Sequence, residues 1–232
     1  MERILVAATT NRHKITEISA ILAPFGYRVI SRADANVPDF EVEEDGETFE
    51  ENSLLKARAI HEYLQGAYAV IADDSGLAAD ALSGAPGVYS ARFADPASPE
   101  DAADYAAADR DTAQLHRSRQ DRANNAKLLR LLAAQNGGEG VPEALRTARF
   151  VSVITLLEEG AADASAVPAI CCRGEVEGRV AFAEDGTEGF GYDPLFIPDG
   201  YTMTFGQFAP EEKNRISHRS RALLKLREEL MR

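Results

Sequence analysis

Residues 70–77 read Val-Ile-Ala-Asp-Asp-Ser-Gly-Leu, and this stretch decides both the fold and the chemistry to look for. An apolar, strand-like run ends abruptly in two carboxylates and a hydroxyl group, ahead of a turn glycine. We therefore expect hard oxygen ligands, Asp73 and Asp74, at the mouth of a sheet. Such ligands hold Mg²⁺, and Mg²⁺ in enzymes most often holds phosphate. The alternative is a strand that leads into a solvated Asp-Asp-Ser-Gly turn.

Two strand-helix alternations precede this stretch. A β-rich run at 3–8 is followed by apolar residues at helical spacing, and strand-like sequence resumes at 27–30. A capping box formed by Thr48 and Glu51 opens a second helix, which leads to the strand at 68–72. This alternation predicts an α/β fold in which helices cover a sheet.

The second half of the chain adds strands of another kind. Strand-like runs at 148–157, 167–173 and 175–182 are separated by short turns, which indicates antiparallel hairpins and hence a mixed sheet. The last helix, at 219–230, carries leucines on one stripe and is expected to dock by that face. The Ala- and Asp-rich stretch 94–120 has few large apolar residues. We interpret it as a solvated helix or mobile helical insertion without chemistry, within a single domain.

The composition limits the classes of partner. The 232 residues include 25 basic and 38 acidic ones, a net charge of −13, which argues against binding to nucleic acid or anionic membranes because both need a basic face. No apolar run approaches the roughly 20 residues that span a bilayer, and no signal peptide precedes the first strand, so we expect a cytoplasmic protein. The adjacent Cys171 and Cys172 suggest neither a zinc site nor a disulfide framework.

The turn from Thr9 to Lys14 has the parts of a phosphate cradle. Hydroxyl and amide side chains precede a helix whose first backbone N–H groups are free, and a lysine follows within the first turn. The turn lacks the glycines and the Gly-Lys-Ser/Thr ending of a P-loop, which excludes a P-loop site. Any capped helix start has a similar sequence, so this motif alone is a weak predictor.

A second acidic cluster, at 41–45, precedes Gly46. It could bring a carboxylate toward Asp73 and Asp74, or it could remain a solvated loop. Because adjacent strand residues point to opposite faces, Asp73 and Asp74 are expected to play different roles.

Two later segments hold groups suited to a nucleobase. Residues 187–194 interleave glycines with aromatic residues; glycines allow close backbone approach, and an exposed ring can stack on a flat base. Residues 211–220 concentrate cations and hydrogen-bond donors in an otherwise acidic chain. The alternatives are a tight hairpin with aromatic core residues, and a helix cap at Ser217 with ordinary surface charges.

Six motifs occur in the order found in one family. They are Ala-Thr-Thr-Asn-Arg-His-Lys at 8–14, Phe-Glu-Glu-Asn-Ser-Leu-Leu-Lys-Ala at 49–57, Ala-Asp-Asp-Ser-Gly-Leu at 72–77, Gly-Ala-Pro-Gly-Val-Tyr-Ser-Ala-Arg at 84–92, Phe-Gly-Tyr-Asp-Pro at 190–194 and Ile-Ser-His-Arg at 216–219. With these motifs the chain resembles the inosine/xanthosine triphosphate pyrophosphatases, which hydrolyse aberrant purine nucleoside triphosphates to the monophosphate and pyrophosphate. The match runs from the first strand to the last helix, and six motifs in register are far more specific than any one.

The resemblance implies an elongated, two-lobed α/β fold with a twisted mixed β-sheet flanked by helices. It also implies an active-site cleft between the lobes, a Mg²⁺ requirement and a homodimer. Asp74 matches the metal-binding general base, and Glu43 matches a second metal carboxylate. The residues implied to bind substrate are Thr9, Thr10, Asn11, Arg12, His13, Lys14 and Lys56 for the triphosphate, Ser75 as a further contact, and Phe190, Gly191, Tyr192, Asp193, Lys213, His218 and Arg219 for the base.

One departure from the family pattern concerns the first turn. Thr10 stands where many relatives carry glycine, which restricts the turn to negative φ or strains it.

The function that follows is Mg²⁺-dependent hydrolysis of ITP, dITP and XTP at the α-phosphorus. The resemblance assigns the basic role to Asp74, and Lys14 and Lys56 offset the charge of the leaving pyrophosphate. Lys213 and Arg219 are candidate donors to the 6-oxo group of hypoxanthine and xanthine. Two alternatives are a related pyrophosphatase that acts on pyrimidine or modified nucleotides, and a nucleotide-binding sensor that does not cleave.

Overall fold

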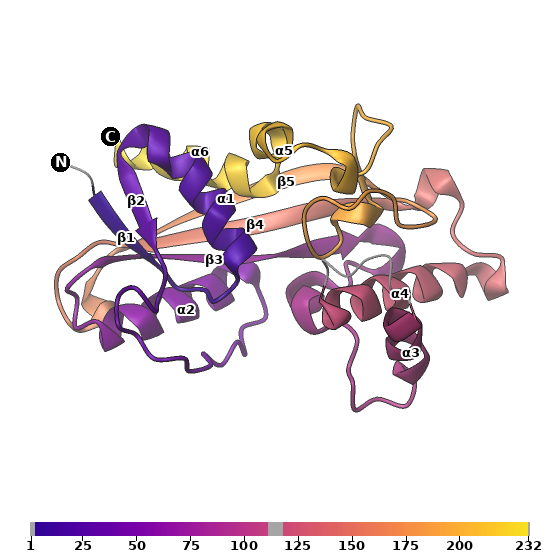
Figure 1. The fold of residues 1–232 in the computed structure, drawn as a ribbon, viewed down its shortest axis with the longest axis horizontal. Helices are drawn as coiled ribbons and strands as arrows, with labels where there is room; N and C mark the ends of the chain where they lie inside the picture. The colour runs from indigo at the N-terminus through magenta and orange to yellow at the C-terminus, as the bar shows by residue number, and fades with distance from the viewer. Residues whose placement is uncertain (1–2, 111–117, 232) are drawn as a thin grey trace. The chain divides into compact units, whose positions relative to one another are not determined.

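The computed structural model describes residues 3–110 and 118–231, and within them it shows an α/β fold built on a six-stranded sheet (Figure 1). The strand order is β2-β1-β3-β4-β5-β6. β1 pairs in parallel with β2 and β3, whereas β5 and β6 pair antiparallel, so the predicted α/β class and mixed sheet are confirmed. The strands are β1 (Arg3–Ala7), β2 (Tyr27–Ile30), β3 (Ala69–Ala79), β4 (Thr147–Leu157), β5 (Ala169–Val180) and β6 (Phe196–Pro198).

The chain divides into two compact units. Unit 1 consists of Met1–Ser75, Val151–Glu175 and Ile216–Arg232, and unit 2 consists of Gly76–Phe150 and Val176–Arg215. β3, β4 and β5 each contribute residues to both units. The single domain, the elongated shape and the cleft between lobes stay predictions.

Unit 1 has helices on both faces of its part of the sheet. One apolar core lies between the sheet and the helices α1 (Arg12–Leu22) and α6 (His218–Leu230), and a second lies between the sheet and α2 (Phe49–Tyr63) (Figure 1). Ile71 belongs to the first core and Ala72 to the second, because successive strand residues point to opposite faces. The same alternation puts Asp73 on the α1 and α6 side and Asp74 on the α2 side.

β3 does not end at the aspartates, so the predicted strand end and turn glycine are wrong. The strand continues to Ala79, and Asp73 and Asp74 lie in its middle. It tolerates two buried carboxylates because cations from neighbouring helices face each of them. Gly76 serves a close approach: a Cβ atom there would lie 2.3 Å from the Ser90 hydroxyl oxygen.

β5 is likewise one strand where two were expected. Gly174 lies inside it and was taken from sequence for a turn between two strands. A Cβ atom at Gly174 would lie 2.1 Å from the carbonyl oxygen of His218 and 2.4 Å from the amide nitrogen of Ala222. The glycine therefore lets α6 approach the sheet.

Helix boundaries in unit 1 agree with the sequence signals. The Thr48 hydroxyl accepts from the backbone of Glu51, and the Glu51 carboxylate accepts from the backbone of Thr48, which confirms the capping box. Leu223 and Leu226 of α6 are buried in the first core, as the leucine stripe predicted. The buried face of α2 includes the polar residues Asn52, Ser53 and Lys56, which prepares the site described below.

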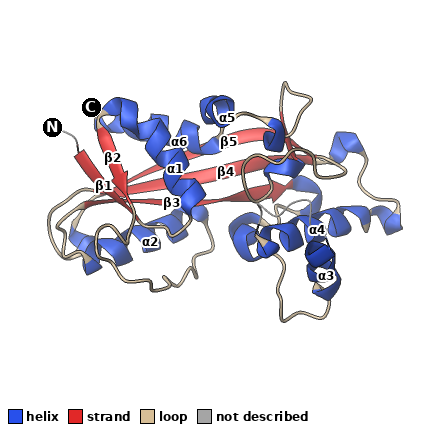
Figure 2. Ribbon diagram, in the orientation of Figure 1, coloured by secondary structure: helices blue, strands red, loops and turns tan. Residues whose placement is uncertain are grey.

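In unit 2, α3 (Ala102–Arg110) and α4 (Arg119–Ala133) lie side by side (Figure 2). Asp101 and Asp104, next to and within α3, are buried and paired with Lys127 and Arg130 of α4 at 2.7 to 2.9 Å. The described part of stretch 94–120 is therefore packed by ion pairs and not merely solvated. Residues 111–117 of that stretch lie outside the described residues.

The rest of unit 2 is organised around aromatic side chains. The ring centroids of Phe150 and Phe196 lie 4.7 Å apart, and those of Phe196 and Phe205 lie 5.3 Å apart. The helix α5 (Pro210–Ile216) follows this core. Over the described chain, the helices fall short of the length and apolarity that crossing a membrane requires.

Candidate active site

The turn before α1 is fixed by its own side chains. Asn11 caps the helix, since its side-chain oxygen accepts from the backbone N–H groups of His13 and Lys14 at 2.9 and 3.3 Å. The Thr9 hydroxyl oxygen accepts from the N–H of Asn11 at 3.1 Å. Among the described residues, Thr10 is not one of the non-glycine positions with positive φ, so the turn forms without that strain. The exposed start of the helix suits an anion.

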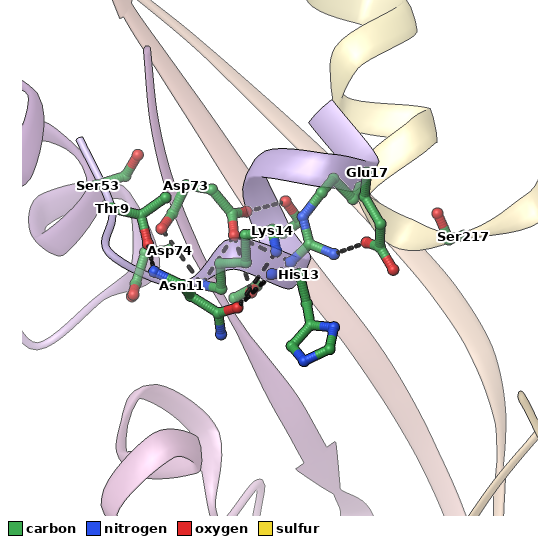
Figure 3. A network of polar contacts seen from close by, with 12 residues as sticks. Thr9, Asn11, His13, Lys14, Glu17, Ser53, Asp73, Asp74 and Ser217 are labelled. Carbon is green, nitrogen blue, oxygen red and sulfur yellow. Dashed lines mark hydrogen bonds and ion pairs between the residues drawn. The ribbon is translucent and has the colours of Figure 1, made fainter. Parts of the chain in front are cut away.

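Asp73 is the centre of a buried charge cluster (Figure 3). Its Oδ2 atom lies 2.8 Å from Lys14 Nζ and 3.0 Å from Arg219 Nη2, and its Oδ1 atom accepts from the Ser152 hydroxyl at 2.5 Å. Burial alone would raise the pKa of Asp73, but the guanidinium and the ammonium outweigh it and hold that pKa well below its ordinary value. Asp73 is therefore a carboxylate anchor for two cations.

Arg219 lies in this cluster and was expected to bind the base. Its side chain is fully buried, and its guanidinium contacts Glu17 and Asp73 and donates to the Ser75 hydroxyl at 3.0 Å. Ser75, expected as a substrate contact, in turn donates to Asp73 at 3.1 Å. In these positions both side chains orient Asp73.

Asp74 has a different environment on the α2 side of β3. Its Oδ1 atom lies 2.6 Å from Lys56 Nζ, and Lys56 Nζ also lies 3.1 Å from Glu44 Oε2. The Oδ2 atom of Asp74 is buried without a hydrogen-bond partner among the described residues. Burial raises the pKa of Asp74 despite the nearby lysines, whereas the two carboxylates raise the pKa of Lys56 against the effect of its own burial.

The acidic loop contributes Glu44 to this group. Sequence reasoning assigned the second metal carboxylate to Glu43, which is exposed, whereas Glu44 is the residue that shares Lys56 with Asp74. The loop is held by α2: Asn52 accepts from the Gly46 N–H at 2.9 Å and donates to the Gly46 carbonyl at 3.3 Å. Two alternatives were open for this loop, a carboxylate near the aspartates or a solvated loop, and in the structure Glu44 lies near Asp74, with Lys56 between them.

These residues fit a divalent cation that also binds phosphate. Within the described residues, no group of three or more His, Cys, Asp or Glu side chains is arranged to hold a metal. Mg²⁺ commonly uses only one or two carboxylates, with waters and substrate phosphates as its other ligands. Asp74, with a buried unpartnered oxygen, and Glu44 meet that requirement.

A second cluster, in unit 2, surrounds Asp193. Its Oδ2 atom lies 2.7 Å from Lys213 Nζ and accepts from the Phe190 N–H at 2.7 Å. Lys213 Nζ lies 4.9 Å from the centroid of the Phe190 ring, within cation–π range. Phe190 is half-buried, whereas Asp193 and Lys213 are buried.

The neighbours of Phe190 in sequence have structural partners. Tyr192 is buried and donates its hydroxyl hydrogen to the Ser90 carbonyl at 2.9 Å, and burial raises its pKa well above the ordinary value. The Gly191 carbonyl accepts from Asn125 Nδ2 at 3.1 Å. His218, at the start of α6 in unit 1, is also buried.

Sequence reasoning missed several residues of these clusters. Ser152 comes from a strand 79 positions after Asp73, so no local pattern indicates it. Glu17 follows Lys14 at helical spacing, which was an available signal for a shared face. Asn125 follows another asparagine on α4, and nothing in its local sequence points to Gly191.

Comparison with known proteins places the chain among relatives over nearly its full length. A sequence model of the Ham1 family matches residues 5–229. The chain belongs to the Ham1 family. A dITP/XTP pyrophosphatase from Desulforamulus reducens is 45% identical to this Ham1 chain over 229 residues, which cover 98% of this chain and 96% of that protein. A dITP/XTP pyrophosphatase from Clostridium perfringens is 39% identical, with coverage of 97% and 96%.

Solved structures of Ham1 proteins have the same fold. The Ham1 protein of Coxiella burnetii matches with a TM-score of 0.74 at 33% identity, covering 99% of this chain and 98% of the other. The Ham1 protein of Staphylococcus aureus matches with a TM-score of 0.72 at 35% identity, with the same coverage. The resemblance predicted from six sequence motifs is thereby confirmed, and the matched range, residues 5–229, contains the positions of both clusters of this Ham1 chain.

Proposed function

We propose that this chain hydrolyses the non-standard purine nucleoside triphosphates ITP, dITP and XTP to the monophosphate and pyrophosphate. One observation carries the proposal: Asp74 presents a buried, unpartnered carboxylate oxygen beside Lys56, in a cluster that also contains Glu44. The names of the relatives, dITP/XTP pyrophosphatases along nearly the whole chain, support the substrate class.

The triphosphate is bound in unit 1 by backbone and lysine donors. The exposed N-terminus of α1, with Thr10 to His13 around it, offers N–H groups and the positive end of the helix dipole. Lys14 and Lys56 add two ammonium groups, each with hydrogens left over after their carboxylate contacts. In a chain of net charge −13, these local cations are what attracts a polyanion.

Mg²⁺ belongs to the same cluster in this proposal, held by Asp74 and Glu44. When bound, Mg²⁺ polarises phosphate oxygens and offsets their charge. Glu44 takes the place that the sequence motif had assigned to Glu43, because the Glu44 carboxylate reaches Lys56 and the Glu43 side chain is exposed.

Asp74 is the basic group for the attack of water on the α-phosphorus. Its Oδ2 atom has no hydrogen-bond partner among the described residues and can accept a proton, and Lys56 fixes the orientation of the carboxylate. Asp73 does not compete for this role, because its low pKa and its cation partners leave it little basicity. Lys14 and Lys56 stabilise the charge that develops on pyrophosphate as it leaves.

The base is recognised by the cluster in unit 2. Phe190 offers a partly exposed ring for stacking on the purine. Lys213, oriented by Asp193, is the donor for a 6-oxo group, which hypoxanthine and xanthine carry and adenine lacks. Arg219 does not serve here, because its buried guanidinium contacts Glu17 and Asp73.

A homodimer and a cytoplasmic location complete the proposal, without a nucleic-acid or membrane partner. The family resemblance supports the dimer, and the acidic composition supports the absence of nucleic-acid and anionic-membrane partners. Sedimentation equilibrium at working concentration tests the dimer, and a monomeric mass would contradict it.

The function is tested by product analysis across substrates. The purified protein with Mg²⁺ is incubated with ITP, dITP, XTP, ATP, GTP, dUTP and dTTP, and the phosphate products are identified. Pyrophosphate released preferentially from the first three supports the proposal. Preference for dUTP or dTTP would indicate a pyrimidine pyrophosphatase, and tight binding of ITP without turnover would indicate a sensor.

A further inference from the structure

The loop that carries Phe190 is held in place at several points. Gly189 and Gly191, on either side of Phe190, have φ values of +71° and +57°, which lets the chain turn sharply around the ring. Inside the loop, Asp193 accepts from the Phe190 N–H. These contacts fix the local turn, but only bonds to other elements can fix the loop relative to the rest of unit 2.

Two such bonds connect the loop to α4, one through the Ser90 carbonyl and one directly. The Tyr192 hydroxyl donates to the Ser90 carbonyl, and the same carbonyl accepts from Asn124 Nδ2 at 3.1 Å. Asn125 Nδ2 donates directly to the Gly191 carbonyl at 3.1 Å. Asn124 of α4 thus holds the Ser90 carbonyl that accepts from Tyr192, and Asn125 holds Gly191, the residue that follows Phe190.

The chemistry at position 125 requires two donors. The Asn125 side chain is 1% exposed, and its Nδ2 group donates both to Gly191 and to the Glu184 carboxylate. Its Oδ1 atom is buried without a partner among the described residues, so the position is built around the NH₂ end of the amide. An aspartate would place a carboxylate against the Glu184 carboxylate and the Gly191 carbonyl, all of them acceptors.

We propose that Asn125 is a positioning residue for base recognition: by holding the Gly191 carbonyl it sets the place of Phe190, and through it the affinity and selectivity for the nucleobase. This inference rests on the proposed function. Glu184 assists by accepting the second Asn125 hydrogen, which fixes the rotation of the amide.

The test compares Asn125→Asp with the matched control Asn136→Asp. Asn136 also donates from Nδ2 to a glycine carbonyl, that of Gly140 at 2.9 Å, but this bond is exposed and includes no residue of the Phe190 loop. In Asn125→Asp we expect KM for ITP to rise about tenfold or more, the scale for loss of a buried hydrogen-bond donor, with kcat within about twofold of wild type. The preference for ITP over ATP should fall in the same variant, and Asn136→Asp should match wild type in both.

A double variant separates the Gly191 bond from simple charge repulsion. Asn125→Asp with Glu184→Gln restores a donor opposite position 125 and removes one carboxylate, but it does not restore the bond from position 125 to the Gly191 carbonyl. The raised KM should persist in this protein. Full recovery would mean that repulsion between carboxylates caused the defect, and the proposal would be overturned.

Hydrogen exchange supplies a readout that does not depend on turnover. The amides of residues 186–195 should exchange faster in Asn125→Asp than in wild type and in Asn136→Asp. Unchanged exchange in this segment overturns the inference whatever the activity. If the wild type turns over ITP and Asn125→Asp has the wild-type KM, the inference about Asn125 is wrong and the proposed function stands. If the wild type does not turn over ITP, the proposed function is wrong, and hydrogen exchange still decides whether Asn125 holds the loop.

Discussion

The ammonium group of Lys56 lies 2.6 Å from one carboxylate oxygen of Asp74 and leaves the other oxygen buried without a partner among the described residues. The adjacent Asp73 has the opposite character, since Lys14, Arg219 and Ser152 contact its carboxylate. One strand thus carries two different carboxylates at neighbouring positions. Both oxygens of Asp73 have hydrogen-bond or ion-pair partners, and Asp73 orients cations. Asp74 has one oxygen without a partner among the described residues, and that oxygen can take part in the reaction.

Exchanging each aspartate for asparagine should separate the two roles. Asp74→Asn should lower turnover of ITP about a hundredfold to ten-thousandfold, the usual effect of losing a general base. Its loss of stability should be smaller than that of Asp73→Asn, because Lys56 keeps its contact with Glu44. Asp73→Asn should lose about 3–5 kcal/mol of stability, because it leaves the buried Arg219 and the partly buried Lys14 without their shared anion. Urea unfolding and initial rates on both proteins check this. Equal loss of stability in the two variants would contradict the division of roles.

Neighbouring glutamates give a matched test of the proposed metal site. Glu44→Gln should raise the Mg²⁺ concentration needed for half-maximal activity about tenfold or more, because the carboxylate beside Lys56 is removed. Glu43→Gln should behave as wild type, because Glu43 is exposed. Titrating Mg²⁺ at saturating ITP distinguishes them. If Glu43→Gln shows the larger effect, the assignment from the sequence motif was right and that from the geometry is wrong.

Lys14 should act on the triphosphate and not on the base. Lys14→Ala removes a charged donor beside the start of α1, so KM for ITP should rise about tenfold or more. The ratio of kcat/KM for ITP to that for GTP should stay close to the wild-type ratio. Lys225→Ala, at an exposed position on α6, is the control and should leave both quantities unchanged. A changed base preference with intact KM would place Lys14 in base recognition.

The attachment of α3 to α4 predicts a pH dependence of stability. Burial would raise the pKa of Asp101, but its bonds to Lys127 and the Asp95 N–H outweigh it, so that pKa lies below the ordinary value. The unfolded chain therefore takes up the proton first as pH falls. The stabilisation by Asp101 is complete above the unfolded pKa, about 3.9, and is lost as pH falls through it toward the folded pKa.

Unfolding measured by urea between about pH 5 and pH 3 checks this dependence. Wild type should lose stability more steeply with acid than Asp101→Asn, which lacks the titrating group. Asp199→Asn, at an exposed position, should keep the wild-type slope. Parallel slopes for wild type and Asp101→Asn would show that the ion pairs of Asp101 do not contribute to this pH dependence.

Periodic and local signals predicted much of the fold. The capping box at Thr48 and Glu51 and the leucine stripe of α6 depend on short spacings, which a sequence displays directly. The strand breaks expected near Asp73 and at Gly174 were wrong for a shared reason. Charges and glycines usually interrupt strands. Here Arg219, which is far away in the sequence but in contact in the structure, neutralises Asp73, and Gly174 makes room for α6.

In the candidate site, too, some residues could be predicted from the sequence and others could not. Motif order pointed to Asp74, Lys14, Lys56 and Asp193, and the structure brings each of them into a charged cluster. The choice between Glu43 and Glu44 depends on which side chain of an irregular loop turns inward, and that loop is held at Gly46 by Asn52 of another element. No spacing rule conveys such an orientation, because the loop has no period.

The site of bond cleavage provides the most direct test of the proposed chemistry. ITP is hydrolysed with Mg²⁺ in water enriched in oxygen-18, and the products are followed by phosphorus NMR. We predict IMP that carries the label and unlabelled pyrophosphate, because the water activated by Asp74 attacks the α-phosphorus. Label in pyrophosphate, release of orthophosphate with IDP, or intact ITP would contradict it.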